Sequence, residues 1–270
     1  MRLKSIIVIV ACTIFSNTVS AITDTTKPVS LAMNNVAPAS ETVLKASNII
    51  YPEMLDGQQD NFIEYVEQFS EKRRSYLIRT HTRAKSYFPK AKVIFKKYGV
   101  PEEFVVLMAL ESAFNGNAVS SAGAVGYWQI MDDVAKEFGL KIIEGQKKGV
   151  VVKTKTAAGK TKTPVIADDR KNFNKSTHTA ARYLKDRMRN LNNDWLLVAA
   201  SYNWGVGNVW KVMKQTGKVN PTFWDIKAKL PAETRAYVMN FIALNVVFKN
   251  YKNFQDDDLC FKDIVIKNAQ

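Results

Sequence analysis

The chain is organised around residues 107–129, which read LMALESAFNGNAVSSAGAVGYWQ. The overlapping segment 104–110, FVVLMAL, is entirely apolar, and a helix that is apolar on every side is expected to lie inside a core. Glu111 follows this run directly, so its carboxyl should be desolvated, which disfavours the charged form and raises its pKa. A carboxyl that keeps its proton near neutral pH can act as a general acid. The segment therefore predicts a buried helix that presents Glu111 as an acid.

A second interpretation of Glu111 stays open when this residue is taken alone. A carboxylate at a helix end is often bonded to a nearby amide or Arg, and such structural pairs also perturb acid pKa values. After Glu111 the pair Asn115-Gly116 is expected to end the helix, and a loop rich in Gly and Ser follows. The rest of the chain decides between the two interpretations.

Three further motifs follow the Glu111-Ser112 pair in a fixed order. They are NAVS and GAVGYWQ within Asn117–Gln129, AASYN at Ala199–Asn203 and ETRAYV at Glu233–Val238. In this order the motifs resemble those of the lytic transglycosylases of the soluble-lytic type, and they are closest to the membrane-bound D subgroup. The resemblance covers about residues 85–250 of the chain. Because four ordered motifs rarely recur by chance, we expect the chain to share the fold and the chemistry of this family.

The resemblance implies a peptidoglycan lytic transglycosylase that uses no cofactor and no bound metal. Such an enzyme cleaves the β-1,4 bond between N-acetylmuramic acid and N-acetylglucosamine and forms a 1,6-anhydromuramic acid product. By carry-over of the motif, Glu111 is the catalytic residue, which acts first as an acid and then as a base on the 6-hydroxyl group. Two alternatives stay open, namely a hydrolytic muramidase on the same fold and a non-catalytic protein that binds the cell wall.

The same carry-over assigns six further residues to the substrate-binding cleft. They are Ser120, Gln129, Tyr202, Asn203, Glu233 and Tyr237. Structural roles are the alternative for three of them, since Gln129 can fix the loop, Tyr202 can be a core aromatic residue and Glu233 can cap its helix. Trp128 and Trp204 are candidates for stacking on sugar faces, although large aromatic residues at such places are more often part of a core.

Helical spacing of apolar residues occurs on both sides of the central segment. An amphipathic pattern runs from Asp60 to Leu77, and Pro89 is expected to begin a second helix that ends at Gly99. Asp132 is expected to cap a short helix after the loop. Longer helices are predicted at 174–191, 195–203 and 232–250. These patterns predict an all-α fold with one small inserted β-hairpin, and the resemblance implies that the fold is lysozyme-like, of the goose-type or SLT kind.

The inserted hairpin is expected within residues 141–166, which hold seven Lys against one acidic residue, Glu144. Segments rich in Val, Thr and Lys flank Ala157–Gly159, and a three-residue connection that contains Gly suits a hairpin. One interpretation of this insertion is a solvated surface ribbon. The other is a cationic arm that holds an anionic polymer near the cleft or makes a peripheral contact with the envelope surface.

The chain of 270 residues, with 46% hydrophobic and 24% charged residues, suits one main domain with appendages. The parts that these patterns predict differ in composition and periodicity. They are a signal peptide at 1–21, an N-terminal arm or linker at 22–58, N-terminal helices packed on the core at 59–98, the SLT domain at 99–255 and a C-terminal tail at 256–270.

The N-terminus is typical of a secretory signal peptide. Arg2 and Lys4 precede a mostly apolar segment at 5–15, and the small residues up to Ala21 suit cleavage after that position. The segment that ends at Cys12 loosely resembles a lipoprotein processing site, so lipid anchoring is the less favoured alternative. We therefore expect export to the periplasm or the cell envelope.

The formal net charge is +14, with 39 Lys and Arg against 25 Asp and Glu. Such a charge suits nucleic acid, a membrane surface or an anionic polymer, and by itself it does not choose among them. The motifs favour peptidoglycan glycan strands, and not nucleic acid, as the partner of a monomer. His81 and His178 lie far apart and the sequence holds no Cys-His cluster, so a zinc site is not expected.

Overall fold

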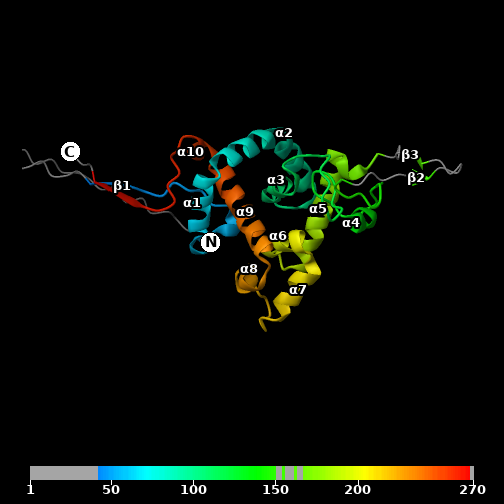
Figure 1. Cartoon of the computed structure of the whole chain (residues 1–270). Helices are drawn as coiled ribbons and strands as arrows, with labels where there is room; N and C mark the ends of the chain where they lie inside the picture. Colours follow the sequence, from blue (N-terminus) through cyan, green and yellow to red (C-terminus); the bar gives the residue numbers. More distant parts are fainter. Residues whose placement is uncertain (1–41, 150–153, 156–160, 163–166, 268–270) are drawn as a thin grey trace, which may run out of the picture. The chain divides into compact units, whose positions relative to one another are not determined.

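In the computed structural model, which describes residues 42–149, 154–155, 161–162 and 167–267, the fold is built from helices with two short strand pairs (Figure 1). The predicted signal peptide at 1–21, with Cys12, lies outside the described residues. The α-helices are α1 (Ile63–Lys72), α2 (Arg74–Tyr98), α3 (Leu107–Ser112), α4 (Asp132–Glu137), α5 (Phe173–Asn190), α6 (Trp195–Trp204), α7 (Val206–Lys214), α8 (Phe223–Ile226), α9 (Ala232–Lys249) and α10 (Tyr251–Gln255). Short 3₁₀ helices occur between them, namely η1 (Glu53–Leu55), η2 (Gln59–Asn61), η3 (Glu102–Val106), η4 (Asp169–Lys171) and η5 (Lys227–Lys229).

The core is built around α9, which covers most of the helix predicted at 232–250. Between Val238 and Val247 every residue of α9 except Asn240 is buried, and α1, α3 and α6 pack against this helix. The ring of Phe241 lies against that of Phe104 in η3, with centroids 5.5 Å apart. Full burial of a Leu, Ile or Phe side chain stabilises a fold by roughly 1.5–3 kcal/mol. Packing on α9 therefore fixes where α3 and α6 stand.

The structure corrects the predicted division of the N-terminal helices. The chain breaks at Arg73, between α1 and α2, and Pro89 lies inside α2 instead of at a helix start. A proline inside a helix removes one N–H donor and usually kinks or breaks the helix. Pro89 is on the exposed side of α2, where water can satisfy the carbonyl group that loses its partner. Gly99 ends α2 with φ 65°, as predicted.

The helix that carries Glu111 is shorter than predicted. Residues 102–106 form η3, and α3 covers only Leu107–Ser112. The apolar residues of both elements are buried, as the sequence predicts, except Leu110, which is half-buried. A run of apolar side chains therefore lies in the core just ahead of the acid.

The end of α3 also differs from the prediction. The left-handed residues that stop the helix are Ala113 and Phe114, with φ of 48° and 66°, and not Asn115-Gly116. A residue with a Cβ in this region is strained by about 1–2 kcal/mol. The Phe114 ring is 5% exposed and stacks on Tyr87 of α2, with centroids 5.4 Å apart. Burial of this ring is the interaction that holds the strained turn.

The inserted hairpin is confirmed by the antiparallel pairing of β2 (Thr154–Lys155) with β3 (Thr161–Lys162). Thr154 pairs with Lys162, and Lys155 pairs with Thr161. The predicted connection at Ala157–Gly159 lies outside the described residues. The all-α fold with a small hairpin is thus the observed one.

A second strand pair joins the segments that are predicted from the sequence to be an N-terminal arm and a C-terminal tail. Strand β1 (Thr42–Lys45) pairs with β4 (Ile264–Lys267). Next to it, the backbone N–H of Asn48 donates to the carbonyl of Cys260 at 3.0 Å. The side-chain amide of Asn250 donates to the carbonyl of Ile50 at 2.8 Å. In the part of the chain that the structure describes, no helix is long and apolar enough to cross a membrane.

Candidate active site

Glu111 lies near the end of α3, and the residue as a whole is half-buried. Burial raises the pKa of Glu111 to about 7, and a hydrogen bond from the Tyr237 hydroxyl group, 2.5 Å from Oε1, offsets part of the rise. No second carboxylate among the described residues contributes to this shift. The carboxyl is therefore close to half protonated at neutral pH, which is the condition that a general acid requires.

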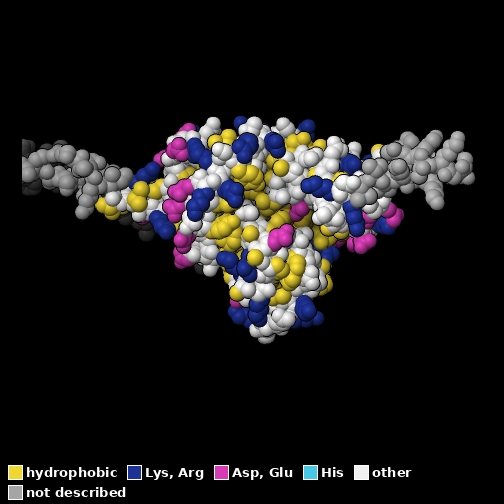
Figure 2. Space-filling view, in the orientation of Figure 1, with side chains coloured by type: hydrophobic (Ala, Val, Ile, Leu, Met, Phe, Trp, Pro, Cys, Tyr) yellow, Lys and Arg dark blue, Asp and Glu magenta, His cyan; other side chains and the backbone are white. Residues whose placement is uncertain are grey.

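Two tyrosines from different helices surround this carboxyl. Tyr237 belongs to α9 and Tyr202 to α6. Burial raises the pKa of both hydroxyl groups well above the usual value, and the negative charge of Glu111 raises it further. Both tyrosines therefore stay protonated and serve as hydrogen-bond donors. In Figure 2, acidic side chains stand among hydrophobic ones near the place where α3, α6 and α9 meet in Figure 1.

Hydrogen bonds fix the loop after α3 against these helices. The Ser112 hydroxyl group donates to the carbonyl of Tyr127 at 2.8 Å, and the Tyr202 hydroxyl group donates to the carbonyl of Trp128 at 2.7 Å. The Trp128 ring is fully buried, and its indole N–H donates to the Thr177 hydroxyl group of α5 at 3.0 Å. Trp128 is thus a core residue and offers no face for a sugar.

Gln129 and Ser120 hold the shape of the loop. Gln129 has φ 46°, and its side-chain amide donates to the carbonyl of Gly126 at 2.9 Å. The Ser120 hydroxyl group accepts a hydrogen bond from the backbone N–H of Ala124 at 2.9 Å and so closes a turn. Gln129 also lines a cavity of about 70 Å³ together with Tyr202. These contacts agree with the structural role predicted as the alternative for Gln129, which is to fix the loop. Because Gln129 lines this cavity beside Tyr202, it also remains part of the candidate site.

Asn203 and Glu233 lie near the junction of α6 with α9. The side-chain oxygen of Asn203 accepts a hydrogen bond from the Thr234 hydroxyl group at 2.8 Å, which ties the two helices together. Glu233 is exposed in the first turn of α9, and no side chain caps this helix. Of the predicted site residues, Tyr237 alone contacts Glu111 by a hydrogen bond within the described chain.

A buried ion cluster behind the loop was not predicted. Arg170 is completely buried, and its guanidinium group donates to both carboxylate oxygens of Asp168, at 3.0 and 2.8 Å. It also pairs with Asp132, so Asp132 does not cap α4, whose N-cap position is Met131. Gly126 has φ 84°, and a Cβ at this position would lie 2.0 Å from the carbonyl oxygen of Arg170. Only glycine fits where the loop crosses this cluster.

The described residues contain no group of three or more His, Cys, Asp and Glu side chains placed to hold a metal ion. The charged groups around the loop instead pair with one another, as the contacts of Arg170 with Asp168 and Asp132 illustrate. What the arrangement offers chemically is one carboxyl with a raised pKa, Glu111, held by a phenol, Tyr237.

Residues 90–222 match the family model of the transglycosylase SLT domain. This segment of the chain belongs to the SLT domain family. Membrane-bound lytic murein transglycosylase D of Escherichia coli K12 is 32% identical to it over 184 residues, which are 67% of this chain and 35% of that protein. Membrane-bound lytic murein transglycosylase C of Yersinia pestis Pestoides F is 27% identical over 188 residues, which are 64% of this chain and 48% of that protein. The chain thus spans between a third and a half of the length of these relatives.

The solved structures that align with the chain include two lytic transglycosylases. An inactive mutant of the lytic transglycosylase Slt of Pseudomonas aeruginosa aligns with a TM-score of 0.45 and 19% identity, over 68% of this chain and 27% of that one. The 70 kDa soluble lytic transglycosylase of Escherichia coli aligns with a TM-score of 0.42 and 22% identity, over 59% of this chain and 24% of that one.

Proposed function

We propose that the protein is a peptidoglycan lytic transglycosylase, which cleaves the β-1,4 bond between N-acetylmuramic acid and N-acetylglucosamine. The observation that carries this proposal is the state of Glu111, a carboxyl whose pKa burial raises to about 7 and to whose pKa shift no second carboxylate among the described residues contributes. Most glycosidases use two carboxylates. A single acid suits a reaction in which one group first gives a proton and then takes one back.

The proposed reaction uses Glu111 twice. Its proton passes to the bridging oxygen, the glycosidic bond breaks, and positive charge develops at the anomeric carbon of the muramic acid residue. The Glu111 carboxylate then accepts the proton of the 6-hydroxyl group of the same sugar. At the same time the oxygen of this hydroxyl group bonds to the anomeric carbon. The product is a 1,6-anhydro sugar, no water is consumed, and Glu111 returns to its protonated state.

The remaining predicted site residues are proposed to bind the glycan around the cleaved bond. They are Ser120, Gln129, Tyr202, Asn203, Glu233 and Tyr237. Tyr237 also has a second proposed role, because its hydroxyl group holds the carboxyl of Glu111.

We further propose that a monomer acts in the periplasm or cell envelope after export by the segment 1–21. The membrane-bound relatives support a place in the envelope, and lipid attachment at Cys12 is the less favoured route.

Digestion of purified sacculi tests the proposed reaction directly. A lytic transglycosylase releases muropeptides that end in an anhydro sugar, each lighter by one water than the product of a hydrolytic muramidase. Mass spectrometry of the soluble products therefore separates the two reactions. A product set of hydrated reducing ends assigns the muramidase activity, and the absence of any release under conditions where the protein binds sacculi assigns a non-catalytic wall-binding function.

A Tyr237→Phe variant is expected to shift the pH dependence of cleavage to higher pH. The Tyr237 hydroxyl group stabilises the Glu111 carboxylate and so lowers its pKa; without this bond the pKa rises above about 7 and the acid form persists to higher pH. A hydrogen bond to a charged group is worth about 1.5–3 kcal/mol, or roughly one to two pH units. The measurement is kcat/KM against pH, where the alkaline limb should move up by at least about one unit.

Tyr65→Phe is the matched control for this shift. Tyr65 also loses a hydrogen bond to α9, from its hydroxyl group to the side chain of Asn240 at 2.7 Å, but it does not contact Glu111. Its alkaline limb should stay in place. A limb that moves to lower pH in Tyr237→Phe contradicts the role given to this hydroxyl group.

Deletion of residues 150–163 is expected to weaken retention on sacculi at low salt and to leave turnover of short soluble glycans nearly unchanged. The segment carries four of the seven Lys of the insertion, and exposed charge acts over a Debye length of about 8 Å at physiological salt. Residues 147–149 are kept because the backbone N–H of Lys148 donates to the carbonyl of Ser120 at 3.1 Å. Co-sedimentation with sacculi at several salt concentrations measures the effect.

A full-length variant with these four Lys changed to Gln separates charge from bulk. It should lose retention as the deletion does. Loss of turnover on short glycans by the deletion alone means that the hairpin forms a wall of the active site. Unchanged retention in both variants means that it is a solvated ribbon.

A further inference from the structure

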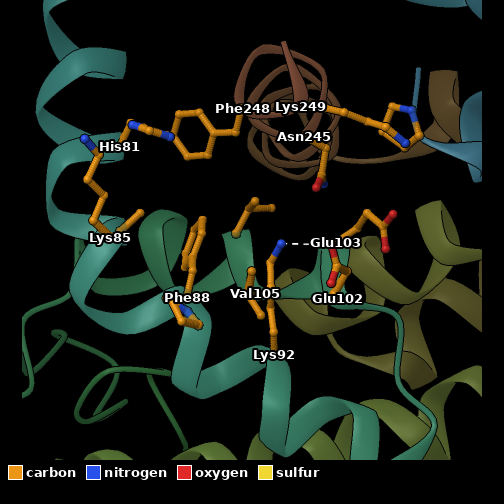
Figure 3. A pocket seen from close by; sticks show the side chains of 14 residues that line it. His81, Lys85, Phe88, Lys92, Glu102, Glu103, Val105, Asn245, Phe248 and Lys249 are labelled. Carbon is orange, nitrogen blue, oxygen red and sulfur yellow. Dashed lines mark hydrogen bonds and ion pairs between the residues drawn. The ribbon is translucent and has the colours of Figure 1, made fainter. Parts of the chain in front are cut away.

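A second cavity lies between α2, η3 and α9 (Figure 3). Its volume is about 460 Å³, within the range of about 300–1,000 Å³ that is common for small-molecule sites. Glu111, Tyr202 and Tyr237 do not line it. A molecule bound in this cavity is therefore separate from a glycan held against Glu111.

The floor of this cavity is apolar. Phe88 of α2 and Phe248 of α9 face each other with ring centroids 6.1 Å apart. Val105 and Val106 of η3 are buried beneath them, at 2% and 3% exposure. Such a floor favours a ligand with an apolar middle, at roughly 25 cal/mol for each Å² that leaves water.

Charged side chains of both signs line the cavity, namely Lys85, Lys92 and Lys249 with Glu102 and Glu103. Figure 3 shows Lys85 beside His81 on one side of it. Burial, and after it the charge of Lys85, lower the pKa of His81 to about 4, so Lys85 alone supplies positive charge at this end at neutral pH. Glu102 and Glu103 stand on the other side. Lys92 pairs with Glu102 at 2.8 Å, and Glu103 forms no ion pair with any described residue.

A buried polar side chain points into the space between these ends. Asn245 is 6% exposed and interrupts the apolar run ALNVV of α9, and Figure 3 shows it extending from α9 toward the cavity. Its amide nitrogen donates to the carbonyl of Phe241 at 3.0 Å, while its oxygen accepts no hydrogen bond from the described residues. The Nδ1 atom of His81 is likewise buried without a partner among the described residues. Asn245 therefore offers a ligand in the cavity an acceptor oxygen that no described residue uses.

We propose that this cavity binds a short peptide that carries both a free amino group and a free carboxylate. The amino group pairs with Glu103 and the side-chain oxygen of Asn245, the carboxylate pairs with Lys85, and the apolar portion lies over Phe88 and Val105. A ligand with one charged end leaves the other end of the cavity unpaired. Peptide stems of peptidoglycan carry both groups. Naming wall peptides as the source of the ligand rests on the proposed function, whereas the assignment of the ligand to the class of short peptides does not.

Calorimetric titration of the full chain tests the site with defined probes. The first probe is the peptide stem cut from purified peptidoglycan by an amidase, and the second is the tripeptide Ala-Leu-Ala with free ends. Forms of the tripeptide with an acetylated amino end or an amidated carboxyl end complete the set. Both free peptides should bind, and either block should weaken binding about tenfold, since each removes one charged contact worth about 1.4 kcal/mol. Tighter binding of the stem than of the tripeptide identifies wall peptides as the source.

Variants locate the binding within the cavity. Lys85→Gln and Glu103→Gln should each lose about tenfold in affinity for the free tripeptide, by the same arithmetic. Lys90→Gln is the matched control, because Lys90 is exposed on α2 but does not line the cavity. Circular dichroism melts check that the variants fold. Equal affinity of free and blocked peptides, equal affinity of Lys85→Gln and Lys90→Gln, or no heat from either peptide at millimolar concentration overturns the proposal. None of these results bears on cleavage at Glu111, so the proposed function is tested separately.

Discussion

A Glu111→Gln variant is expected to lose glycan cleavage by about a hundred- to ten-thousand-fold, the usual contribution of general acid catalysis. The amide keeps the size of the carboxyl and still accepts the hydrogen bond from Tyr237, but it has no proton to give to the bridging oxygen. The measurement is the rate of anhydromuropeptide release from sacculi by a folded variant. Near-normal turnover contradicts the assignment and moves the role to another carboxylate, first to Glu233, which Glu233→Gln then tests.

The same substitution is expected to stabilise the fold at alkaline pH. A loss of activity caused by misfolding can therefore be distinguished from a loss caused by the missing proton. Burial raises the pKa of Glu111 from 4.5 to about 7, so the native state binds this proton more tightly than the unfolded chain. The native protein therefore loses stability as pH rises from about 4.5 to about 7, by about 3 kcal/mol in all. Glu111→Gln avoids this loss. Urea unfolding at pH 5 and at pH 8 should show the variant gaining over the wild type only at the higher pH.

The state of Glu111 was predictable because its cause is local in sequence. Seven apolar residues precede it, and a buried helix end desolvates whatever acid stands there. The end of α2 at Gly99 and the extent of α9 were predictable for the same reason, since a left-handed stop and a run of apolar residues are both encoded by neighbours in the chain. The hairpin was predictable from β-branched residues that flank a Gly.

Features that depend on distant residues were not predictable. Pro89 stays inside α2 because the other face of that helix is packed in the core, a fact that its local sequence does not contain. Ala113 and Phe114 take left-handed conformations because the Phe114 ring finds a place against Tyr87. Strands β1 and β4 pair although about 220 positions separate them in the chain. Tertiary contacts outweigh local propensity in each case.

The ion cluster behind the loop that follows α3 is the clearest example of this limit. Asp168 and Arg170 stand together in the sequence, but Asp132 is far from them and looked like a helix cap. The insertion between them also takes part, because the carbonyl of Ile143 accepts a hydrogen bond from Arg170 at 3.1 Å. The cluster thus joins α4, the base of the insertion and η4. It holds them behind the loop, where Arg170 also donates to the carbonyl of Ile130 at 3.3 Å.

An Arg170→Leu variant is expected to lose about 3–5 kcal/mol of folding stability, the usual result of removing one partner of a buried ion pair. Burial by itself raises the pKa of Asp168, but the hydrogen bonds from Arg170 and Ile143 outweigh it and keep the pKa below its usual value. Without Arg170, a carboxyl that is 1% exposed must either stay charged without a cation or take up a proton. Urea unfolding at pH 7 measures the loss of stability.

The double variant Asp168→Leu and Arg170→Leu decides whether the loss comes from the unpaired charge. Replacing both partners of a buried pair with apolar groups is often close to neutral, and Asp132, whose side chain is 27% exposed, can be hydrated once Arg170 is gone. The double variant should therefore recover most of the stability that Arg170→Leu loses. If it is as unstable as the single variant, the hydrogen bonds from Arg170 to the carbonyls of Ile130 and Ile143, and not the charge pair, are what hold this loop in place.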